Sequence, residues 1–236
     1  MNSDENIKLY NNFISRIKNE KIKKLWEENT QSHFKEKFFD YIYKDILKIN
    51  NPNILEFGVH AGYSTSLFLD ICKLNNGKLF SIDINDYSKN FSDHNWNFIK
   101  SRDDNFDYVE KFIPEKVDVI LIDTLHKAKH VEKILYHYYP RLNKGGLVIV
   151  DDISWLYYTP QAERDHFYME INNRETFFKL IEIFNSNMKN INLEFNFVHS
   201  GVCKITKKND LVLNVADKIK SREFSIKNLL KKIIGR

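Results

Sequence analysis

The sequence predicts an α/β fold, in which helices cover a doubly wound, mostly parallel seven-stranded sheet that ends in an antiparallel hairpin. Two observations indicate this fold. From residue 53 onwards, short apolar runs rich in β-branched residues alternate with longer segments of helical periodicity, a pattern typical of parallel strands that are buried on both faces. The last two apolar runs are joined by only a few residues around Ser200-Gly201. That connection is too short for a parallel crossover, so the last strand should run antiparallel.

The first fifty residues are expected to be helical and to cover part of the domain. Apolar residues recur here at spacings of three or four, which gives a helix one apolar face. The sequence Asn50-Asn51-Pro52 then marks a boundary, because asparagine and proline favour turns. We therefore predict an N-terminal helical segment at residues 1–50. Its apolar stripe consists of Phe34, Phe38, Ile42, Ile46 and Ile49.

Seven strands are predicted from apolar runs that are bounded by turn residues. The run VDVILI at residues 117–122 is the clearest of them, and the run at residues 96–99 is the weakest. Together they define a central α/β domain at residues 51–208. The predicted strands are residues 53–57, 78–83, 96–99, 117–122, 147–150, 193–198 and 202–206.

Helices are predicted between the strands, wherever apolar residues recur every three or four positions. Asn76-Gly77 should form a turn after the first helix. Lys144-Gly145-Gly146 should end the third, because glycine commonly follows a helix C-terminus. The predicted helices are residues 63–74, residues 106–113, the segment with apolar residues from Val131 to Leu142, and residues 164–187.

Residues 209–236 form a separate basic region, which we interpret as an amphipathic C-terminal helix. Lysines and arginines surround its apolar stripe, and such a helix can lie on an anionic membrane surface. Docking on its own domain or on a partner subunit is the preferred interpretation, and the sequence is compatible with a homo-oligomer. The stripe consists of Phe224, Ile226, Leu229, Leu230, Ile233 and Ile234.

Composition excludes several classes of protein. The chain has 42% hydrophobic and 29% charged residues, which excludes wholesale disorder. No apolar run approaches the roughly 20 residues that cross a bilayer, and the first twenty residues are too polar for a signal peptide. A net charge of +4 is too small to indicate a nucleic-acid partner. Cys72 and Cys203 lie in apolar surroundings far apart in the sequence, so we expect buried free thiols and a cytoplasmic protein.

The turn after the first strand is a candidate ligand-binding loop. It reads LEFGVHAGYS, in which Gly58 and Gly62 allow a sharp turn and a close approach to a ligand. The carboxylate of Glu56 would repel a pyrophosphate and attract a ligand with an ammonium group. Asp83 ends the second strand, where a carboxylate can accept hydrogen bonds from both hydroxyls of a ribose. The dinucleotide motif G-x-G-x-x-G is not present in this turn.

These motifs resemble those of the class I S-adenosylmethionine-dependent methyltransferases over roughly residues 50–206. LEFGVHAGYS resembles the first motif of that family, and SIDIND resembles the second. The resemblance implies a Rossmann-like fold that binds S-adenosylmethionine, with Glu56 near the methionine end, Asp83 on the ribose and Asp104 at the adenine. The adjacent Asp103 could serve in place of Asp104. The loop residues implied to wrap the cofactor are Gly58, Gly62, Tyr63 and Ser64.

Carboxylates also follow two further strands. Asp123 closes the fourth strand, and Asp151 and Asp152 follow the fifth. Neighbouring strand residues point to opposite faces, so Asp151 and Asp152 converge only if the strand ends there. Three acids in one cleft raise one another's pKa, and a divalent cation would remove this repulsion. Oxygen ligands favour Mg²⁺ or Mn²⁺ over zinc, whereas capping of the next helix is the alternative role for such acids.

His126 is the candidate general base, because it lies three residues beyond Asp123 and an imidazole can accept a proton at cellular pH. The other histidines, including His60 and His130, are interpreted as ordinary polar residues. The pattern resembles the metal-dependent O-methyltransferases that modify sugars of macrolide antibiotics. This resemblance implies His126 as the base, and Thr124 stands where such relatives usually carry glycine. The metal ligands that it implies are Asp123, Asp151 and Asp152.

The expected function is the transfer of a methyl group from S-adenosylmethionine to a hydroxyl of a small molecule or a sugar, in a glycan or a glycosylated metabolite. Trp155, Tyr157 and Tyr158 could stack on an acceptor ring or form a packed lid. A metal-independent methyltransferase is one alternative, which chelation would distinguish. Glu56 and the missing G-x-G-x-x-G count against a nicotinamide-dependent dehydrogenase. A non-catalytic nucleotide-binding or membrane-associated module would show no turnover.

Overall fold

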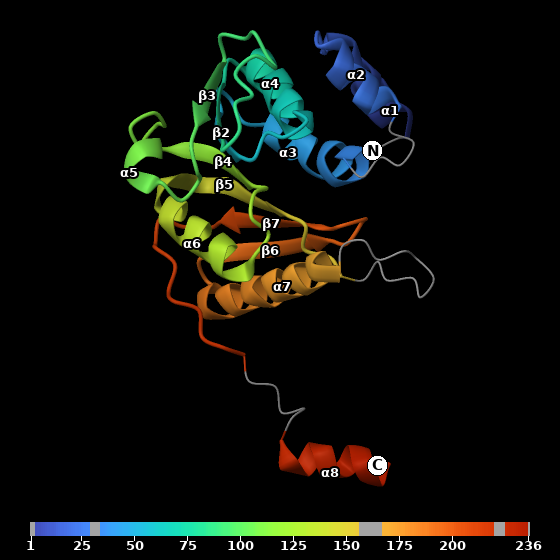
Figure 1. Cartoon of the computed structure of the whole chain (residues 1–236), viewed down its shortest axis with the longest axis vertical. Coiled ribbons are helices and arrows are strands. Elements are labelled where there is room, and N and C mark those ends of the chain that lie inside the picture. The colour runs from blue at the N-terminus through green and yellow to red at the C-terminus, as the bar shows by residue number, and fades with distance from the viewer. Residues whose placement is uncertain (1–2, 29–33, 156–166, 220–224, 236) are drawn as a thin grey trace.

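Seven strands form one sheet in the order β3-β2-β1-β4-β5-β7-β6 (Figure 1). The computed structural model describes residues 3–28, 34–155, 167–219 and 225–235. The first five strands are parallel, and β7 is antiparallel to both β5 and β6. The predicted fold class and its antiparallel hairpin are therefore confirmed. The strands are β1 (Asn53–Phe57), β2 (Lys78–Asp83), β3 (Trp96–Lys100), β4 (Val117–Ile122), β5 (Leu142–Asp151), β6 (Ile191–Asn196) and β7 (Val202–Lys207).

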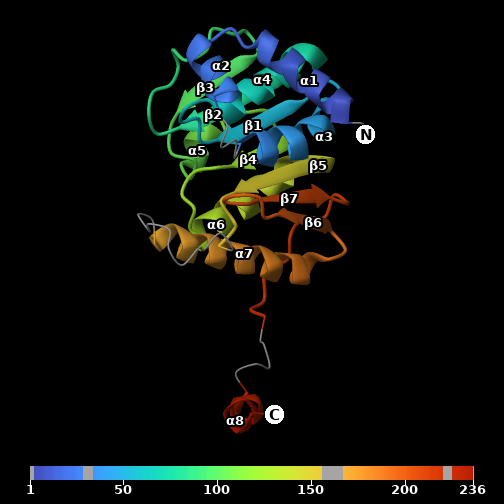
Figure 2. The same ribbon diagram turned by 90° about the vertical axis from the view of Figure 1, so that its right-hand side faces the viewer.

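Helices cover both faces of this sheet (Figure 2). The N-terminal helices and α4 cover one face, and α5, α6 and α7 cover the other. The helices are α1 (Ser3–Arg16), α2 (Glu20–Glu27), the π-helix η1 (Lys35–Tyr43), α3 (Lys44–Leu47), α4 (Tyr63–Asn75), α5 (Phe106–Val109), α6 (Ala128–Tyr138), the 3₁₀-helix η2 (Tyr139–Arg141), α7 (Phe167–Asn187) and α8 (Ile226–Ile234).

The central strands are apolar without alternation because both of their faces are buried. In β4, Ile120 and Ile122 belong to the core under α6 and α7. Val119 and Leu121, which point the other way, belong to the core under α4 and the N-terminal helices. All four side chains are buried. This arrangement is the physical origin of the VDVILI pattern.

The N-terminal helices share their core with the sheet. Phe38, Ile42 and Ile46 are buried against α4 and the central strands, as the apolar stripe predicted. The indole of Trp26 donates a hydrogen bond of 2.9 Å to Ser66 on α4. This packing fixes the position of η1, and thereby of its side chains, relative to the carboxyl ends of the strands.

Two predicted helix ends are wrong. The third predicted helix ends at Tyr138 instead of Gly145, because Pro140 has no N–H to continue it. Leu142 already pairs with Val117 as part of β5. The helix predicted at residues 106–113 covers only Phe106–Val109. The N–H groups of Lys111 and Phe112 bond three residues back, to Tyr108 and Val109, so the chain continues in tighter turns.

The C-terminal region is only partly helical, in contrast to the prediction for residues 209–236. Leu213 is buried, and Asn214 is held by Asn187, which accepts from its backbone N–H at 2.7 Å and donates to its carbonyl at 3.0 Å. These contacts keep residues 209–219 out of a helix. Phe224, like Lys220 and Arg222, lies outside the described residues.

Helix α8 stands apart from the sheet (Figure 1). None of its residues is buried, so it does not dock on its own domain in this structure, and docking on a partner subunit stays a prediction. No helix among the described residues is long and apolar enough to cross a membrane. In the core, Cys72 and Cys203 are buried free thiols, as expected.

Candidate active site

A cavity of about 360 Å³ lies at the carboxyl ends of β1, β2 and β4. This is the edge at which open α/β sheets bind ligands, and the volume is in the range of small-molecule sites. Three of the predicted site residues line it, namely Gly58, Asp83 and Asp123. The remaining lining residues are His60, Ile82, Ile84, Asn85, Tyr87, Ser101, Arg102, Asp103, Thr124, Leu125 and His130.

Gly58 is the point at which the loop after β1 passes closest to β4. Its φ is +98°, and a Cβ at this position would lie 1.9 Å from the carbonyl oxygen of Asp123. The Gly58 N–H donates to the carbonyl of Ile82 at 2.9 Å, and the Asp123 N–H donates to Phe57 at 2.9 Å. Only glycine fits this position, because any side chain would meet the backbone of β4.

Asp83 holds the same loop from the side of β2. Its Oδ2 accepts hydrogen bonds from the backbone N–H of Val59 at 2.9 Å and of His60 at 3.4 Å. Its Oδ1 accepts from Asn85 at 2.9 Å. The carboxylate thus closes the loop against the cavity, and its predicted contact with a ribose stays a prediction.

Glu56 is buried beneath the loop and does not line the cavity. Its carboxyl group accepts hydrogen bonds from three hydroxyls, those of Ser64 (2.6 Å), Thr65 (2.9 Å) and Ser81 (2.5 Å). Burial raises the pKa of Glu56 to about 7, although these three hydrogen bonds oppose the rise. Glu56 of β1 is therefore hydrogen-bonded to β2 through Ser81 and to the start of α4 through Ser64 and Thr65.

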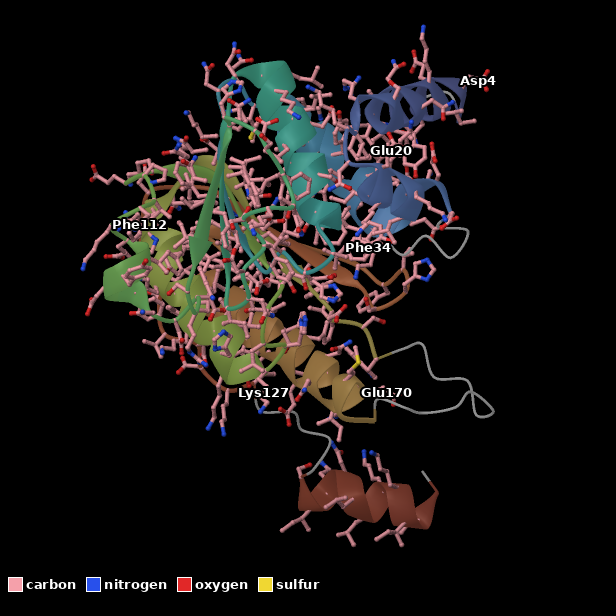
Figure 3. All side chains as sticks on the ribbon, turned by 45° about the horizontal axis from the view of Figure 1, so that its top comes forward. Asp4, Glu20, Phe34, Phe112, Lys127 and Glu170 are labelled. Carbon is pink, nitrogen blue, oxygen red and sulfur yellow. The ribbon has the colours of Figure 1, made fainter. Side chains whose placement is uncertain are left out.

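Two other predicted loop residues face the N-terminal segment. Gly62 has a φ of +84° and is the N-cap of α4. The ring of Tyr63 stacks on Phe34 with their centroids 4.3 Å apart, and Figure 3 shows Phe34 beside α4. Neither Gly62 nor Tyr63 lines the cavity.

Asp103, and not Asp104, faces the cavity. Its carboxylate accepts from the Thr124 hydroxyl at 2.5 Å and lies 2.7 Å from Nε2 of His130. Burial would raise the pKa of Asp103, but the bonds to His130 and Thr124 outweigh it and lower the pKa. Asp104 pairs instead with Arg102 at 2.8 Å, and that hydrogen bond holds the pKa of Asp104 at about 2.

Two of these residues have roles that were not expected from the sequence. The hydroxyl of Thr124, at the end of β4, donates a hydrogen bond to Asp103. His130 was interpreted as an ordinary polar residue, but it lies against the same carboxylate and lines the cavity. An acid, a hydroxyl and an imidazole from three separate segments therefore form one wall of the cavity.

Two of the three acids predicted as metal ligands, Asp123 and Asp152, lie near His126 beside this cavity. Nε2 of His126 lies 3.5 Å from Asp123 Oδ1 and 3.7 Å from Asp152 Oδ2. β5 ends at Asp151, and Asp152 has a φ of +56°, which breaks the alternation of the strand. The strand therefore ends where the prediction required, and the carboxylates of Asp151 and Asp152 both reach the ammonium of Lys37. We call Asp123, Asp151 and Asp152 the acidic cluster.

The acidic cluster is electrostatically strained. Burial and the neighbouring carboxylates of Asp151 and Asp152 raise the pKa of Asp123 well above its ordinary value. Burial also raises the pKa of Asp151, although Lys37 opposes that shift. Burial and the neighbouring carboxylates thus both disfavour the ionised forms of these acids.

Lys37 was not found by the sequence reasoning. Its Nζ lies 2.6 Å from Asp151 Oδ1, 3.4 Å from Asp152 Oδ1 and 2.7 Å from the hydroxyl of Ser200. Burial would lower the pKa of Lys37, but Asp151 and Asp152 outweigh it and raise the pKa. Its position three residues after Phe34 places Lys37 near the apolar stripe of the predicted helix. A lysine on a buried helix face needs an acidic partner, so this position could have indicated an ion pair.

The chemistry of the acidic cluster fits a hard divalent cation. Three carboxylates and one ammonium leave a formal charge of −2, and all three acids offer oxygen donors. Within the described part of the chain, no group of three or more His, Cys, Asp or Glu side chains has a geometry that could hold a metal ion. The ammonium of Lys37 contacts two of the three carboxylates instead.

Comparisons with known proteins agree with this site. Residues 55–153 match a family described as a methyltransferase domain. That segment runs from β1 to the residues just after β5, and it contains the whole cavity lining and the acidic cluster. None of the curated protein sequences matches the chain significantly.

Solved structures share the fold at low sequence identity. The chain is similar to the MycE methyltransferase from the mycinamycin biosynthetic pathway in complex with Mg, SAH and mycinamycin VI (20% identity, TM-score 0.52, 73% of this chain and 49% of that one). A proposed caffeoyl-CoA O-methyltransferase from Staphylococcus aureus has 17% identity and a TM-score of 0.59, over 86% and 99% of the two chains. The SAH-bound methyltransferase PaMTH1 from Podospora anserina has 14% identity and a TM-score of 0.52, over 88% and 89%. The chain spans about half the length of MycE.

Proposed function

We propose that the chain is a class I S-adenosylmethionine-dependent methyltransferase, because residues 55–153 match a methyltransferase domain family, and that it transfers a methyl group to a hydroxyl of a small molecule or a sugar. His126 is the proposed general base, and Asp123, Asp151 and Asp152 are the proposed ligands of Mg²⁺ or Mn²⁺. One observation carries the proposal. Nε2 of His126 lies 3.5 Å from Asp123 and 3.7 Å from Asp152, next to a cavity that Asp123 also lines.

The reaction needs a proton acceptor at the hydroxyl. The acceptor oxygen loses its proton to Nε2 of His126 and forms a bond to the methyl carbon, while the bond from that carbon to sulfur breaks and S-adenosylhomocysteine leaves. A bound divalent ion would acidify the hydroxyl. The protein's main contribution is to hold both reactants in line, an effect that can supply about 7–11 kcal/mol.

The cofactor would occupy the cavity at the ends of β1, β2 and β4. Gly58 and Asp83 would approach the ribose and methionine parts, and Asp103 would face the adenine, since these residues line the cavity. Asp104 is the less favoured adenine contact because Arg102 and Lys133 already hold it.

The choice of a hydroxyl acceptor and of a metal rests on chemistry and resemblance. The cluster offers oxygen donors and surplus negative charge, and the similar MycE structure contains Mg. A sugar in a glycan or a glycosylated metabolite is proposed from the resemblance to sugar O-methyltransferases. Trp155 packs on Phe177 of α7 with their centroids 4.6 Å apart, whereas Tyr157 and Tyr158 lie outside the described residues.

A metal-independent methyltransferase is the second candidate, and Lys37 favours it. Its ammonium already neutralises part of the cluster from 2.6 Å. Under this alternative His126 still accepts the proton, and the three acids serve to fix Lys37 and His126.

Calorimetry and a transfer assay distinguish these functions. The full chain is titrated with S-adenosylhomocysteine, with and without Mn²⁺, and then assayed with methyl-labelled S-adenosylmethionine on a panel of sugars and glycosylated metabolites. We expect cofactor binding, transfer that stops in chelator, and loss of transfer in Asp151→Asn with cofactor binding retained. Asp86→Asn, on the exposed loop after β2, is the control. Transfer that persists in chelator would support the metal-independent alternative, and no cofactor binding would exclude both.

A further inference from the structure

Lys37 is a buried cation that joins three distant segments of the chain. Its side chain is only 3% exposed. The ammonium contacts Asp151 and Asp152 at the end of β5, and the hydroxyl of Ser200 in the turn between β6 and β7. The rings of Phe34 and Phe38 lie 5.6 Å from it. A lysine in such surroundings is held in one place, so it acts on its neighbours as a fixed charge.

The backbone around Lys37 is also unusual. It belongs to η1, a π-helix of nine residues, and π-helical turns are rare and frequent at functional sites. The N-terminal helices hold η1 in place by burying Phe38, Phe39 and Ile42. The acidic cluster therefore receives a charge from a segment outside the matched methyltransferase domain, which begins at residue 55.

We infer that Lys37 is a positioning residue of the acidic cluster, and that its ammonium is the resident counter-ion that weakens the binding of a divalent cation there. The inference rests on the proposed function in one respect, namely that the cluster binds such a cation. It adds that the N-terminal segment, through Lys37, sets the affinity of the acidic cluster for the divalent cation.

The geometry explains how one lysine can act in this way. Lys37 contacts Asp151 Oδ1 and Asp152 Oδ1, whereas Asp123 Oδ1 and Asp152 Oδ2 are directed toward His126. A divalent cation held by all three acids would have to share Asp151 and Asp152 with a fixed positive charge. Repulsion between two cations at such short range is substantial even where the surroundings are polarisable. Without Lys37 the cation would meet three carboxylates and no competitor.

The same argument predicts opposite effects on metal affinity and on the stability of the metal-free protein. Removing the ammonium leaves Asp151 as a buried carboxylate without its counter-ion, which destabilises the fold. A bound divalent cation would then compensate for the missing charge. A lysine with a merely structural role would change stability without tightening metal binding.

The test is a Mn²⁺ titration of the full chain and of Lys37→Met, followed by calorimetry and by the electron paramagnetic resonance signal of free Mn²⁺. We expect Lys37→Met to bind Mn²⁺ at least tenfold more tightly than the unaltered chain. Its Tm without metal should be lower, and Mn²⁺ should raise that Tm more than it raises the Tm of the unaltered chain. Lys37→Arg, which keeps the charge, should stay within about threefold of the unaltered chain.

Lys35→Met is the matched control, because Lys35 lies on the same helix and pairs with Asp40 at 2.8 Å, outside the cluster. Its Mn²⁺ affinity should not change. Binding of S-adenosylhomocysteine shows that each variant is folded. Should Lys37→Met fail to fold, Ser200→Ala removes one partner of the ammonium, and we expect about twofold to threefold tighter Mn²⁺ binding.

The outcomes separate this inference from the proposed function. Equal or weaker Mn²⁺ binding by Lys37→Met, or by Ser200→Ala where that variant replaces it, overturns the inference and leaves the metal site in place. If neither the unaltered chain nor any variant binds Mn²⁺, while all of them bind S-adenosylhomocysteine, both the inference and the proposed metal site are wrong. The metal-independent methyltransferase is then the supported function.

Discussion

The carbonyl oxygen of Asp123 lies 1.9 Å from the point that a side-chain carbon on Gly58 would occupy. This contact brings the loop after β1 against the end of β4, where the cavity and the acidic cluster meet. The loop after β1 and the proposed catalytic edge are therefore one packed unit, and a change at either residue should affect both.

Gly58→Ala should destabilise the protein and prevent cofactor binding. The new methyl group would collide with the backbone of β4, and alanine is also unfavourable at a φ of +98°. We expect a loss of about 3 kcal/mol or more in the free energy of unfolding, measured by urea denaturation, and no detectable binding of S-adenosylhomocysteine.

Gly145→Ala is the matched control for this variant. Gly145 has a φ of +83°, but a Cβ there would meet nothing within 4 Å. Gly145→Ala should lower the free energy of unfolding by about 1–2 kcal/mol, from backbone strain alone. Equal losses in the two variants would contradict the close contact between Gly58 and Asp123.

Asp103→Asn should weaken cofactor binding far more than Asp104→Asn. Asp103 lines the cavity and is held by Thr124 and His130, whereas Asp104 pairs with Arg102. We expect at least a tenfold weaker Kd for S-adenosylhomocysteine in Asp103→Asn and less than a twofold change in Asp104→Asn. Calorimetry measures both Kd values. A larger loss of binding in Asp104→Asn than in Asp103→Asn would indicate that Asp104 makes the adenine contact.

Glu56 should make the protein less stable as the pH rises toward neutrality. Its pKa is about 7 in the folded protein against 4.5 for an unperturbed group, so between these values the folded state binds a proton that the unfolded state has released. The free energy of unfolding therefore falls across this interval, by about 3 kcal/mol in total, and levels off above pH 7.

Glu56→Gln should remove this contribution, because glutamine has nearly the same shape and does not ionise. Urea denaturation at pH 5 and at pH 8 measures the effect, and the variant should exceed the unaltered chain in stability at pH 8. Asp123 and Asp151 also have raised pKa values, but both are present in both proteins. Their contributions therefore largely cancel in the difference, because Glu56 is the smallest of the causes that shift the pKa of Asp123. An identical pH dependence in the two proteins would refute the raised pKa of Glu56.

His126→Ala should lower kcat by about 10²–10⁴-fold, the usual range for a general base. It should change the binding of S-adenosylhomocysteine little, because His126 is not among the residues that line the cavity. Steady-state kinetics with an acceptor found in the panel measures this. The exposed His94→Ala is the control, and equal kcat values for the two variants would exclude His126 as the base.

The fold class, a mostly parallel sheet that ends in an antiparallel hairpin, could be predicted from the sequence because it depends on local patterns. Runs such as VDVILI mark strands buried on both faces, and the short link at Ser200-Gly201 indicates an antiparallel hairpin. The positions of Asp83, Asp123 and Asp151 at strand ends also follow from local pattern, since the carboxyl ends of parallel strands meet at one edge.

The roles of individual side chains were harder to predict. The expected place of Glu56 near the cofactor stays a prediction, whereas its hydrogen bonds to three hydroxyls, two from α4 and one from β2, were not foreseen. Asp103 and Asp104 are adjacent acids, and only the packing of His130 and Thr124 distinguishes them. Such choices depend on which neighbours reach a carboxylate, and sequence spacing does not contain that information.

By itself, the sequence determined the order of strands and helices, the glycine turn after β1 and the edge at which the acids gather, because each follows from the periodicity of a short stretch of chain. The tertiary structure alone decided that Lys37 reaches Asp151 and that residues 209–219 run along the domain without forming a helix. Contacts of this kind join segments that are distant in the chain. They form only when the whole core packs, and the free energy of an ion pair or a buried hydrogen bond depends on that packing.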